Sequence, residues 1–205
     1  MRQQGHDHWS WHDFLQHLES LIESPWLAAA FGSTDKAARR KARLKIPSEM
    51  PGWSVYNSDG AARRQEDGSF LSSYGVVVQR DNRVLAEKAV FIGDCTNNEA
   101  EYEGLLAALQ HACGHPAELV LFRVDSMLLA RHLQGAWGCH TIRLEPLYES
   151  AHTLLRNLRS QPVVQEARVE HVYREFNALA DSLANLAIEG RTGNSCPQQI
   201  VNSCW

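Results

Sequence analysis

The pattern of apolar and polar residues changes character once along the chain, near residue 50. Residues 10–30 carry apolar side chains at spacings of three and four, which predicts helix. Ser24-Pro25 interrupts this run, and a stop near residues 31–35 precedes a third, basic helix over about 34–44. Two prolines and a glycine within residues 46–52 then indicate a linker. We therefore expect a small, partly basic helical module over residues 1–50.

Beyond the linker, alternating and β-branched residues predict three successive strands, over residues 53–58, 74–79 and 83–91. A capping box from Thr96 to Glu99 begins a helix over about 97–112. The later elements are a strand, two helices, a strand and a helix, at 119–124, 126–133, 146–159, 167–173 and 177–189. The order βββαβααβα predicts an α/β fold over residues 51–189, with a mixed five-stranded sheet flanked by helices. Residues 190–205 show no periodicity and are expected to be a disordered tail.

Four acidic residues fall at the predicted strand ends and helix flanks: Asp59, Glu101, Asp125 and Asp181. In open sheets the carboxyl ends of strands and the following helix N-termini share an edge, so these residues can meet. Each also has an ordinary explanation, since Asp125 could cap a helix and Asp59-Gly60 could form a turn. Clustered carboxylates repel one another unless a cation is present, and oxygen ligands suit hard divalent ions. The spacing alone leaves both interpretations open.

Composition narrows the class of protein. The chain has 205 residues, of which 44% are hydrophobic and 21% charged, as in ordinary globular proteins. No apolar run reaches the roughly 18 residues that span a bilayer, and the N-terminus lacks a secretory signal pattern. Its five cysteines form no Cys-x-x-Cys pair. We expect a cytoplasmic protein with reduced thiols and no membrane partner.

Four blocks of the sequence resemble the motifs of the type 1 ribonuclease H family, in matching order. They lie at residues 56–61, 96–109, 124–133 and 171–187, so the resemblance covers about residues 53–189. Two phrases are specific in combination: Asn-Asn-x-Ala-Glu-Tyr-x-Gly-Leu-Leu-Ala-Ala-Leu from residue 97, and Arg-Glu-x-Asn-x-x-Ala-Asp-x-Leu-Ala from residue 174. Residues 125–148 are similar to the subgroup that lacks the basic protrusion helix.

The resemblance implies a ribonuclease H-like fold and an endoribonuclease that hydrolyses the RNA strand of RNA–DNA hybrids, leaving 5′-phosphate and 3′-hydroxyl ends. It also implies two Mg²⁺ ions, with Mn²⁺ as a substitute. By analogy Asp59 would bridge both ions and Asp181 would hold the ion on the nucleophile side. Glu101 and Asp125 would hold the other.

The family's substrate contacts carry over to further positions. The backbone at Gly60 and Ala61 would touch ribose hydroxyls, Thr96 would bind a phosphate of the DNA strand, and Asn97 and Asn98 would enter the groove. Helix capping is an alternative for Thr96 that does not exclude this role. Arg174 stands where many relatives carry a histidine in a mobile loop, and would act there by its charge.

Other positions depart from the family pattern. Residues 63–68 replace a Gly-Asn-Pro-Gly-like segment, and the loop around Trp137 is poor in lysine. Trp137 could pack along the DNA backbone or anchor its own loop. The net charge is −4, yet six cations and no acid lie between Lys36 and Lys45. The cations proposed to contact nucleic acid are Arg39, Arg40, Lys41 and Arg43, because affinity for a polyanion comes mainly from such side chains.

Three alternatives remain open, one for the N-terminal module and two for the catalytic domain. Residues 10–44 could instead be a helical appendage with a solvated basic face that docks a partner protein through Trp9, Trp11 and Trp26. The catalytic domain could be an inactive binding module, although its four acids are intact. It could also be a DNA nuclease or transposase-type relative, although the two specific phrases match the hybrid-cleaving branch.

Overall fold

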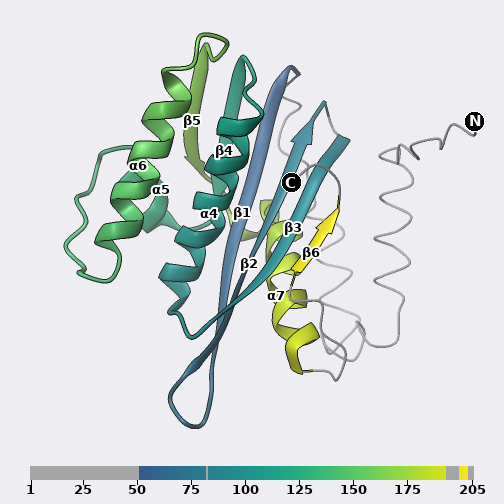
Figure 1. The fold of residues 1–205 in the computed structure, drawn as a ribbon, viewed down its shortest axis with the longest axis vertical. Coiled ribbons are helices and arrows are strands. Elements are labelled where there is room, and N and C mark those ends of the chain that lie inside the picture. The colour runs from purple at the N-terminus through teal and green to yellow at the C-terminus, as the bar shows by residue number, and fades with distance from the viewer. Residues whose placement is uncertain (1–50, 82, 193–198, 203–205) are drawn as a thin grey trace, which may run out of the picture. The chain divides into compact units, whose positions relative to one another are not determined.

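The computed structural model describes residues 51–81, 83–192 and 199–202, and these residues form the predicted α/β fold. The predictions for residues 1–50, the basic segment included, and for residues 193–198 and 203–205 lie outside the described residues. Three antiparallel strands come first: β1 (Trp53–Arg64), β2 (Phe70–Arg80) and β3 (Arg83–Gly93). β4 (Leu119–Val124) pairs with β1 in parallel, and β5 (Glu166–His171) pairs with β4 in parallel (Figure 1).

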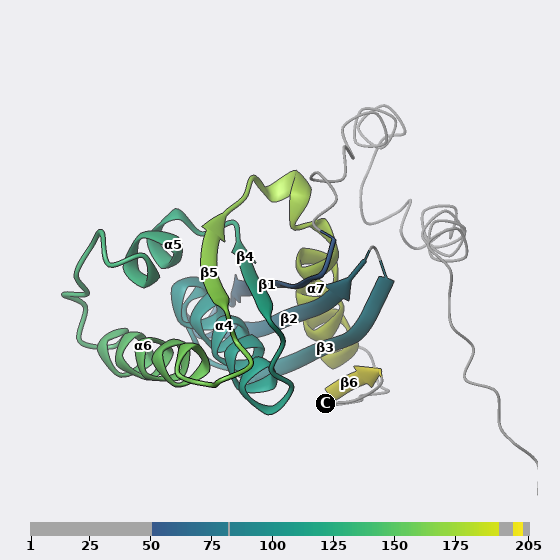
Figure 2. The ribbon, with the colours of Figure 1, turned by 90° about the horizontal axis from the view of Figure 1, so that it is seen from above.

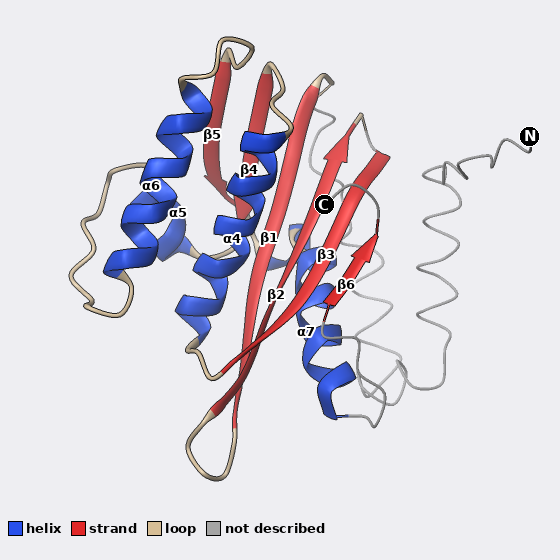
Figure 3. Ribbon diagram, in the orientation of Figure 1, coloured by secondary structure: helices blue, strands red, loops and turns tan. Residues whose placement is uncertain are grey.

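Helices cover both faces of this sheet. α4 (Asn97–Gly114) packs on β1 and β2, and α6 (Glu145–Arg159) lies beside it; α7 (Ala178–Thr192) covers β1, β2 and β3 on the other face (Figures 2 and 3). α5 (Met127–Leu133) and a single 3₁₀ turn, η1 (Arg174–Phe176), complete the described elements. None of the helices described is both long and apolar enough to cross a membrane. The five expected strands and their order are confirmed.

A sixth strand corrects the expectation of a wholly disordered tail. β6 (Gln199–Asn202) pairs antiparallel with β3, with Ile200 opposite Ala89, so the sheet order is β5-β4-β1-β2-β3-β6. α7 also continues to Thr192. An edge strand such as β3 presents unpaired N–H and C=O groups, which a short segment can satisfy. Four residues are too few to reveal a strand by periodicity.

β1 is also longer than predicted, which changes the setting of Asp59. The parallel partner β4 stops at the pair Ser58↔Val124, whereas β2 remains paired as far as Arg64↔Phe70. Asp59 therefore lies inside β1, opposite Gly75 of β2. The interpretation of Asp59-Gly60 as a simple turn is wrong.

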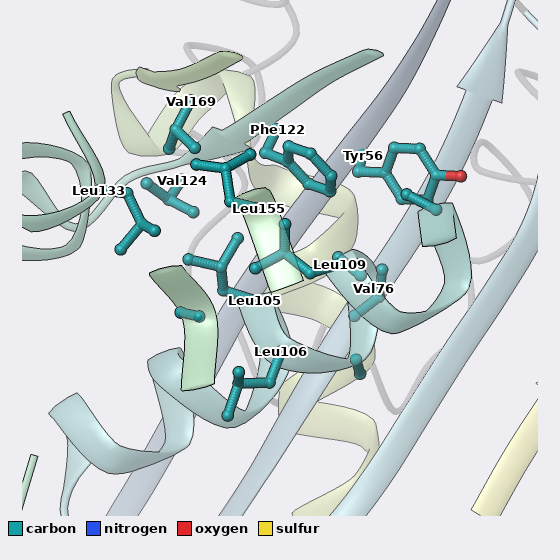
Figure 4. Close-up of a cluster of buried hydrophobic side chains, with 14 of the residues drawn as sticks. Tyr56, Val76, Leu105, Leu106, Leu109, Phe122, Val124, Leu133, Leu155 and Val169 are labelled. Carbon is teal, nitrogen blue, oxygen red and sulfur yellow. The ribbon is translucent and has the colours of Figure 1, made fainter. Parts of the chain in front are cut away.

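The main core lies between the sheet and α4 with α6. Figure 4 shows apolar side chains from β1, β4, α4 and α6 meeting there, among them Tyr56, Leu105, Leu109, Phe122 and Leu155, all at most 2% exposed. Two of the buried tyrosines of this core have histidine partners, since Tyr56 bonds His111 at 3.2 Å and Tyr102 bonds His132 at 2.6 Å. Burial of an aromatic or leucine side chain contributes about 1.5–3 kcal/mol. The core therefore holds α4 firmly against β1.

Candidate active site

The four predicted acids come from four separate segments and meet where the paired strands β1 and β4 part. Asp59 and Asp125 each directly follow the last parallel pair, Ser58↔Val124, so the register places them side by side. Glu101 lies in the second turn of α4 and Asp181 in the first turn of α7. Ser126 provides the side-chain cap of α5, so Asp125 is not that helix's cap. The carboxylate of Asp125 is thus left available to the site.

Two glycines let the helices approach β1 and β2 closely enough for this meeting. A β-carbon on Gly60 would overlap the α4 backbone at Ala100 and Glu101. A β-carbon on Gly75 would overlap the α7 backbone and lie 2.7 Å from the amide nitrogen of Ala184. Gly60 follows Asp59 along β1, and Gly75 of β2 is paired directly opposite Asp59. Both helices can therefore place an acid beside the same aspartate.

The electrostatics show how close the acids are. Burial raises the pKa of Asp59 to about 8, and the charges of Asp125 and Asp181 add to the rise. The Asp59 carboxyl is near enough to hydrogen bond with Asp125 when it is protonated. Burial also raises the pKa of Glu101, with Ser126 opposing and Asp125 adding to the shift. Such shifts are typical of functional carboxylate clusters.

A buried amide, Asn177, joins three parts of the site. Its Nδ2 donates to the Ser58 carbonyl at 2.9 Å and to Oδ1 of Asp125 at 3.2 Å. Its Oδ1 accepts from Asn57 at 3.3 Å, and its carbonyl accepts the Asp181 amide at 3.1 Å. The sequence pattern marked Asn177 only as the first residue of the last predicted helix. Its place in the phrase that begins at residue 174, four residues before Asp181, was the signal that could have marked it as a site residue.

Arg174 brings a positive charge to the acids. Its Nη2 lies 2.5 Å from Oδ1 of Asp181, whose side chain is only 10% exposed. The contact with Asp181 raises the pKa of the guanidinium, and the charges of Asp59 and Asp125 add to this. Arg174 therefore contacts Asp181 directly and lies within the electrostatic range of Asp59 and Asp125, from the 3₁₀ turn that leads into α7.

The N-terminus of α4 holds the residues predicted to contact substrate. The capping box is confirmed: Glu99 accepts the Thr96 amide at 2.7 Å and the Thr96 hydroxyl at 2.6 Å. The Thr96 hydroxyl is thus already donated within the helix cap. Asn97 is exposed and donates to Glu101 at 2.9 Å, and Asn98 is also exposed. Both amides accordingly remain accessible beside the acids.

Comparison with known proteins identifies the fold's relatives. Residues 57–187 match the family described as reverse transcriptase-like. Ribonuclease HI of Halobacterium salinarum is 34% identical over 131 residues, covering 64% of this chain and 62% of the relative. The crystal structure of RNase H1 from that archaeon superposes with a TM-score of 0.59 at 32% identity, over 67% of this chain and 98% of the other.

The chain belongs to the ribonuclease H family. A further member, LC11-RNase H1 in complex with an RNA/DNA hybrid, is 29% identical with a TM-score of 0.59, over 68% of this chain and 99% of that one. The match to a curated Mycobacterium tuberculosis protein, by contrast, spans 40% of that relative's length.

The loop after α5 fits the ribonuclease H subgroup without the basic protrusion. Residues 134–144, all of which the structure describes, connect α5 to α6 without a helix. Trp137 lies in this loop and is half exposed. Arg143 anchors the loop to α4, because its Nε donates to Glu99 at 2.9 Å. The loop thus lies beside the exposed amides of α4.

The oxygen atoms of the four acids suit hard divalent cations, although these side chains alone do not enclose an ion. The acids provide only oxygen atoms, which Mg²⁺ prefers, and Oε2 of Glu101 is buried without a hydrogen-bond partner in the described part of the chain. An unpartnered buried oxygen is costly unless something binds it. Among the described residues, however, no three His, Cys, Asp or Glu side chains converge tightly enough to hold an ion unaided. Mg²⁺ retains several waters, so few protein ligands suffice.

Proposed function

We propose that this protein is an endoribonuclease that hydrolyses the RNA strand of RNA–DNA hybrids. The observation that carries the proposal is the meeting of Asp59, Glu101, Asp125 and Asp181 from four separate segments of a ribonuclease H fold. Membership in a family that includes a ribonuclease HI and a hybrid-bound RNase H1 supports it.

The four acids would hold two Mg²⁺ ions, for which Mn²⁺ could substitute. When bound, such a pair generates hydroxide from water and stabilises the leaving oxygen of a phosphodiester. Asn177 holds the Asp125 carboxylate against β1, so that oxygen is fixed before substrate arrives. The close packing of Gly60 on α4 keeps Glu101 beside Asp59.

The same edge offers the groups that a hybrid needs. Asn97, Asn98 and the backbone at Gly60 and Ala61 border the acids on the α4 side, and can bond ribose hydroxyls and base edges. A protein distinguishes RNA from DNA through the 2′-hydroxyl, and these are donors and acceptors of the right kind. Thr96 could offer its hydroxyl to a phosphate only by exchanging its bond with Glu99.

The test is cleavage of end-labelled RNA–DNA hybrid, duplex RNA and duplex DNA of one sequence, each with Mg²⁺ and with EDTA. We expect cutting of the hybrid alone, in the RNA strand and only with Mg²⁺, leaving 5′-phosphate ends. Asp125→Asn should abolish cleavage and largely retain hybrid binding. Hybrid binding without cleavage by the wild-type protein would instead indicate an inactive binding module, and cutting of duplex DNA would indicate a DNA nuclease.

A further inference from the structure

Arg174 and the acids compete for the same space. The Arg174 Nη2 atom is 2.5 Å from Oδ1 of Asp181, and the charges of Asp59 and Asp125 also act on the guanidinium. A bound Mg²⁺ lies about 2.0–2.1 Å from its ligand oxygens. An ion on this oxygen and a guanidinium bonded to the same oxygen would be like charges only a few ångströms apart, and they repel each other. An ion at Oδ1 is therefore bound more tightly when Arg174 has moved away.

Arg174 is able to move because, of the two side chains in this ion pair, only that of Asp181 is held in place by the surrounding structure. The Arg174 side chain is 71% exposed, whereas the Asp181 side chain is 10% exposed and is fixed on the first turn of α7. Ion pairs with an exposed arginine are weak and readily exchanged. The guanidinium can therefore leave into solvent while the carboxylate stays in place.

We propose that Arg174 is a built-in competitor of divalent cations at Asp181, and that it sets the cation concentration at which the site fills. The inference rests on the proposed function, since it takes Asp181 to be a metal ligand. In this role Arg174 neutralises the acids until an ion arrives. It then swings out of the ligand position, which leaves its charge at the rim of the site.

The chain contains a matched control pair. Arg143 binds Glu99 with the same kind of contact, and the exposures nearly coincide: 66% for Arg143 and 11% for Glu99, against 71% and 10% for Arg174 and Asp181. Glu99, however, is engaged by Thr96 and is not one of the four acids that meet at Asp59. Removing either arginine deletes a similar ion pair, but only Arg174 borders the acids.

The experiment measures Mn²⁺ binding by the full chain without nucleic acid, from the electron paramagnetic resonance signal of free Mn²⁺. We expect Arg174→Gln to bind Mn²⁺ about three- to tenfold more tightly than wild type, a modest change because an exposed guanidinium is screened by water. Arg174→Lys, which retains the charge, should stay close to wild type, and Arg143→Gln should be unchanged. Unchanged or weaker binding by Arg174→Gln would overturn the inference, as would an equal gain in Arg143→Gln.

Thermal unfolding gives a second readout on the same variants. In EDTA both glutamine variants should unfold at lower temperature than wild type, because each lacks an ion pair. Mg²⁺ should raise the midpoint of Arg174→Gln by more than that of Arg143→Gln, and equal rises would contradict the competition. If wild type binds Mn²⁺ and Arg174→Gln binds it more tightly while no hybrid is cut, the competition stands and the proposed substrate fails. If wild type binds no Mn²⁺, both fail.

Discussion

At the scale of single residues, the side chain of Asn177 links several separate segments of the candidate site. One amide group ties the end of β1 to Asp125 and to the start of α7, and its polar atoms are buried. We expect Asn177→Ala to lower the free energy of unfolding by about 1–3 kcal/mol, because buried partners lose a hydrogen bond. If the proposed function holds, it should lower kcat more than it raises KM, since it frees the Asp125 carboxylate of the candidate site without touching substrate. Urea unfolding and steady-state hybrid cleavage measure the two effects.

Asn185→Ala is the control for this prediction. Asn185 lies within α7, which Asn177 directly precedes, and donates to the Asp181 carbonyl at 2.8 Å; within the described part of the chain it makes no hydrogen bond to Asp125, and it is partly exposed. A loss of kcat in Asn185→Ala as large as in Asn177→Ala would show that the effect comes from α7 in general and not from the bridge to Asp125.

Residues that lie in a continuous sequence motif could be identified from the sequence. Residues whose role depends on a contact with a distant part of the chain could not. Asp59 and Asp125 follow the ends of predicted strands, Glu101 and Asp181 lie near the starts of predicted helices, and their motif phrases are continuous in sequence. Local signals were therefore enough to single out these four acids as candidates. Arg143 and Glu99 are 44 residues apart, and Asn177 reaches Ser58 over 119 residues. No periodicity or spacing encodes such contacts. They arise only once the sheet register has brought separate elements together.

At the scale of elements, the contact between β1 and α4 depends on the absence of a side chain at Gly60. In Gly60→Ala the new methyl group would overlap the α4 backbone, so the helix must shift. We expect a loss of about 1–3 kcal/mol in the free energy of unfolding, as for other overpacked sites, and a large loss of cleavage because Glu101 moves with the helix. Gly114→Ala is the matched control. Gly114 ends α4 with open space where its β-carbon would lie, so the variant should be neutral or slightly stabilised.

The packing of α4, α5 and α6 predicts a dependence on pH. His132 of α5 bonds Tyr102 of α4, lies edge-on to Tyr148 of α6, and accepts a hydrogen bond at its carbonyl from His152. Burial lowers the pKa of His132 below its usual 6.5; the backbone at Gly138 opposes this, and the nearby His152 and His140 add to the lowering. Below about pH 6.5 the unfolded chain binds a proton that the folded chain resists, so stability falls as pH falls.

This prediction is checked by urea unfolding at pH 7.5 and pH 5.5. The wild-type protein should lose stability between the two, and His132→Gln should lose less, because it cannot be protonated. His115→Gln is the control, since His115 is exposed at the end of α4. An equal loss in wild type and His132→Gln would place the pH dependence elsewhere.

At the scale of the whole molecule, the prediction from sequence succeeded for elements with a long local pattern and failed for a short one. Apart from the 3₁₀ turn η1, the described strands and helices from β1 to α7 were expected from periodicity and capping. β6 was not, because its four residues become a strand only through pairing with β3. The extra length of β1 has the same origin, since β2 pairs with it beyond the end of β4. Strand pairing depends on two segments of the folded chain and cannot be read from the sequence of either segment alone.

The distribution of charge along the whole chain leads to the last prediction. The net charge is −4, although the ten residues from Lys36 to Lys45 alone carry six positive charges. The candidate active site is acidic, and a domain of this kind needs cations elsewhere to hold a polyanion. If the basic segment binds nucleic acid, replacing Arg39, Arg40, Lys41 and Arg43 by glutamine in the full chain should weaken hybrid binding. It should also reduce the slope of log affinity against log salt by up to about three, because each lost phosphate contact releases one counterion fewer.

Fluorescence anisotropy with a labelled hybrid at several salt concentrations measures both quantities. Arg80→Gln with Arg83→Gln is the control: these exposed arginines flank the β2–β3 turn, at the end of the sheet opposite Asp59. We expect that control to leave affinity and slope unchanged, and the segment variant to retain its rate of cleavage at saturating hybrid, because the acids are intact. An unchanged salt slope in the segment variant would mean that the basic segment does not contact the hybrid, and would favour a partner protein as the ligand of residues 1–50.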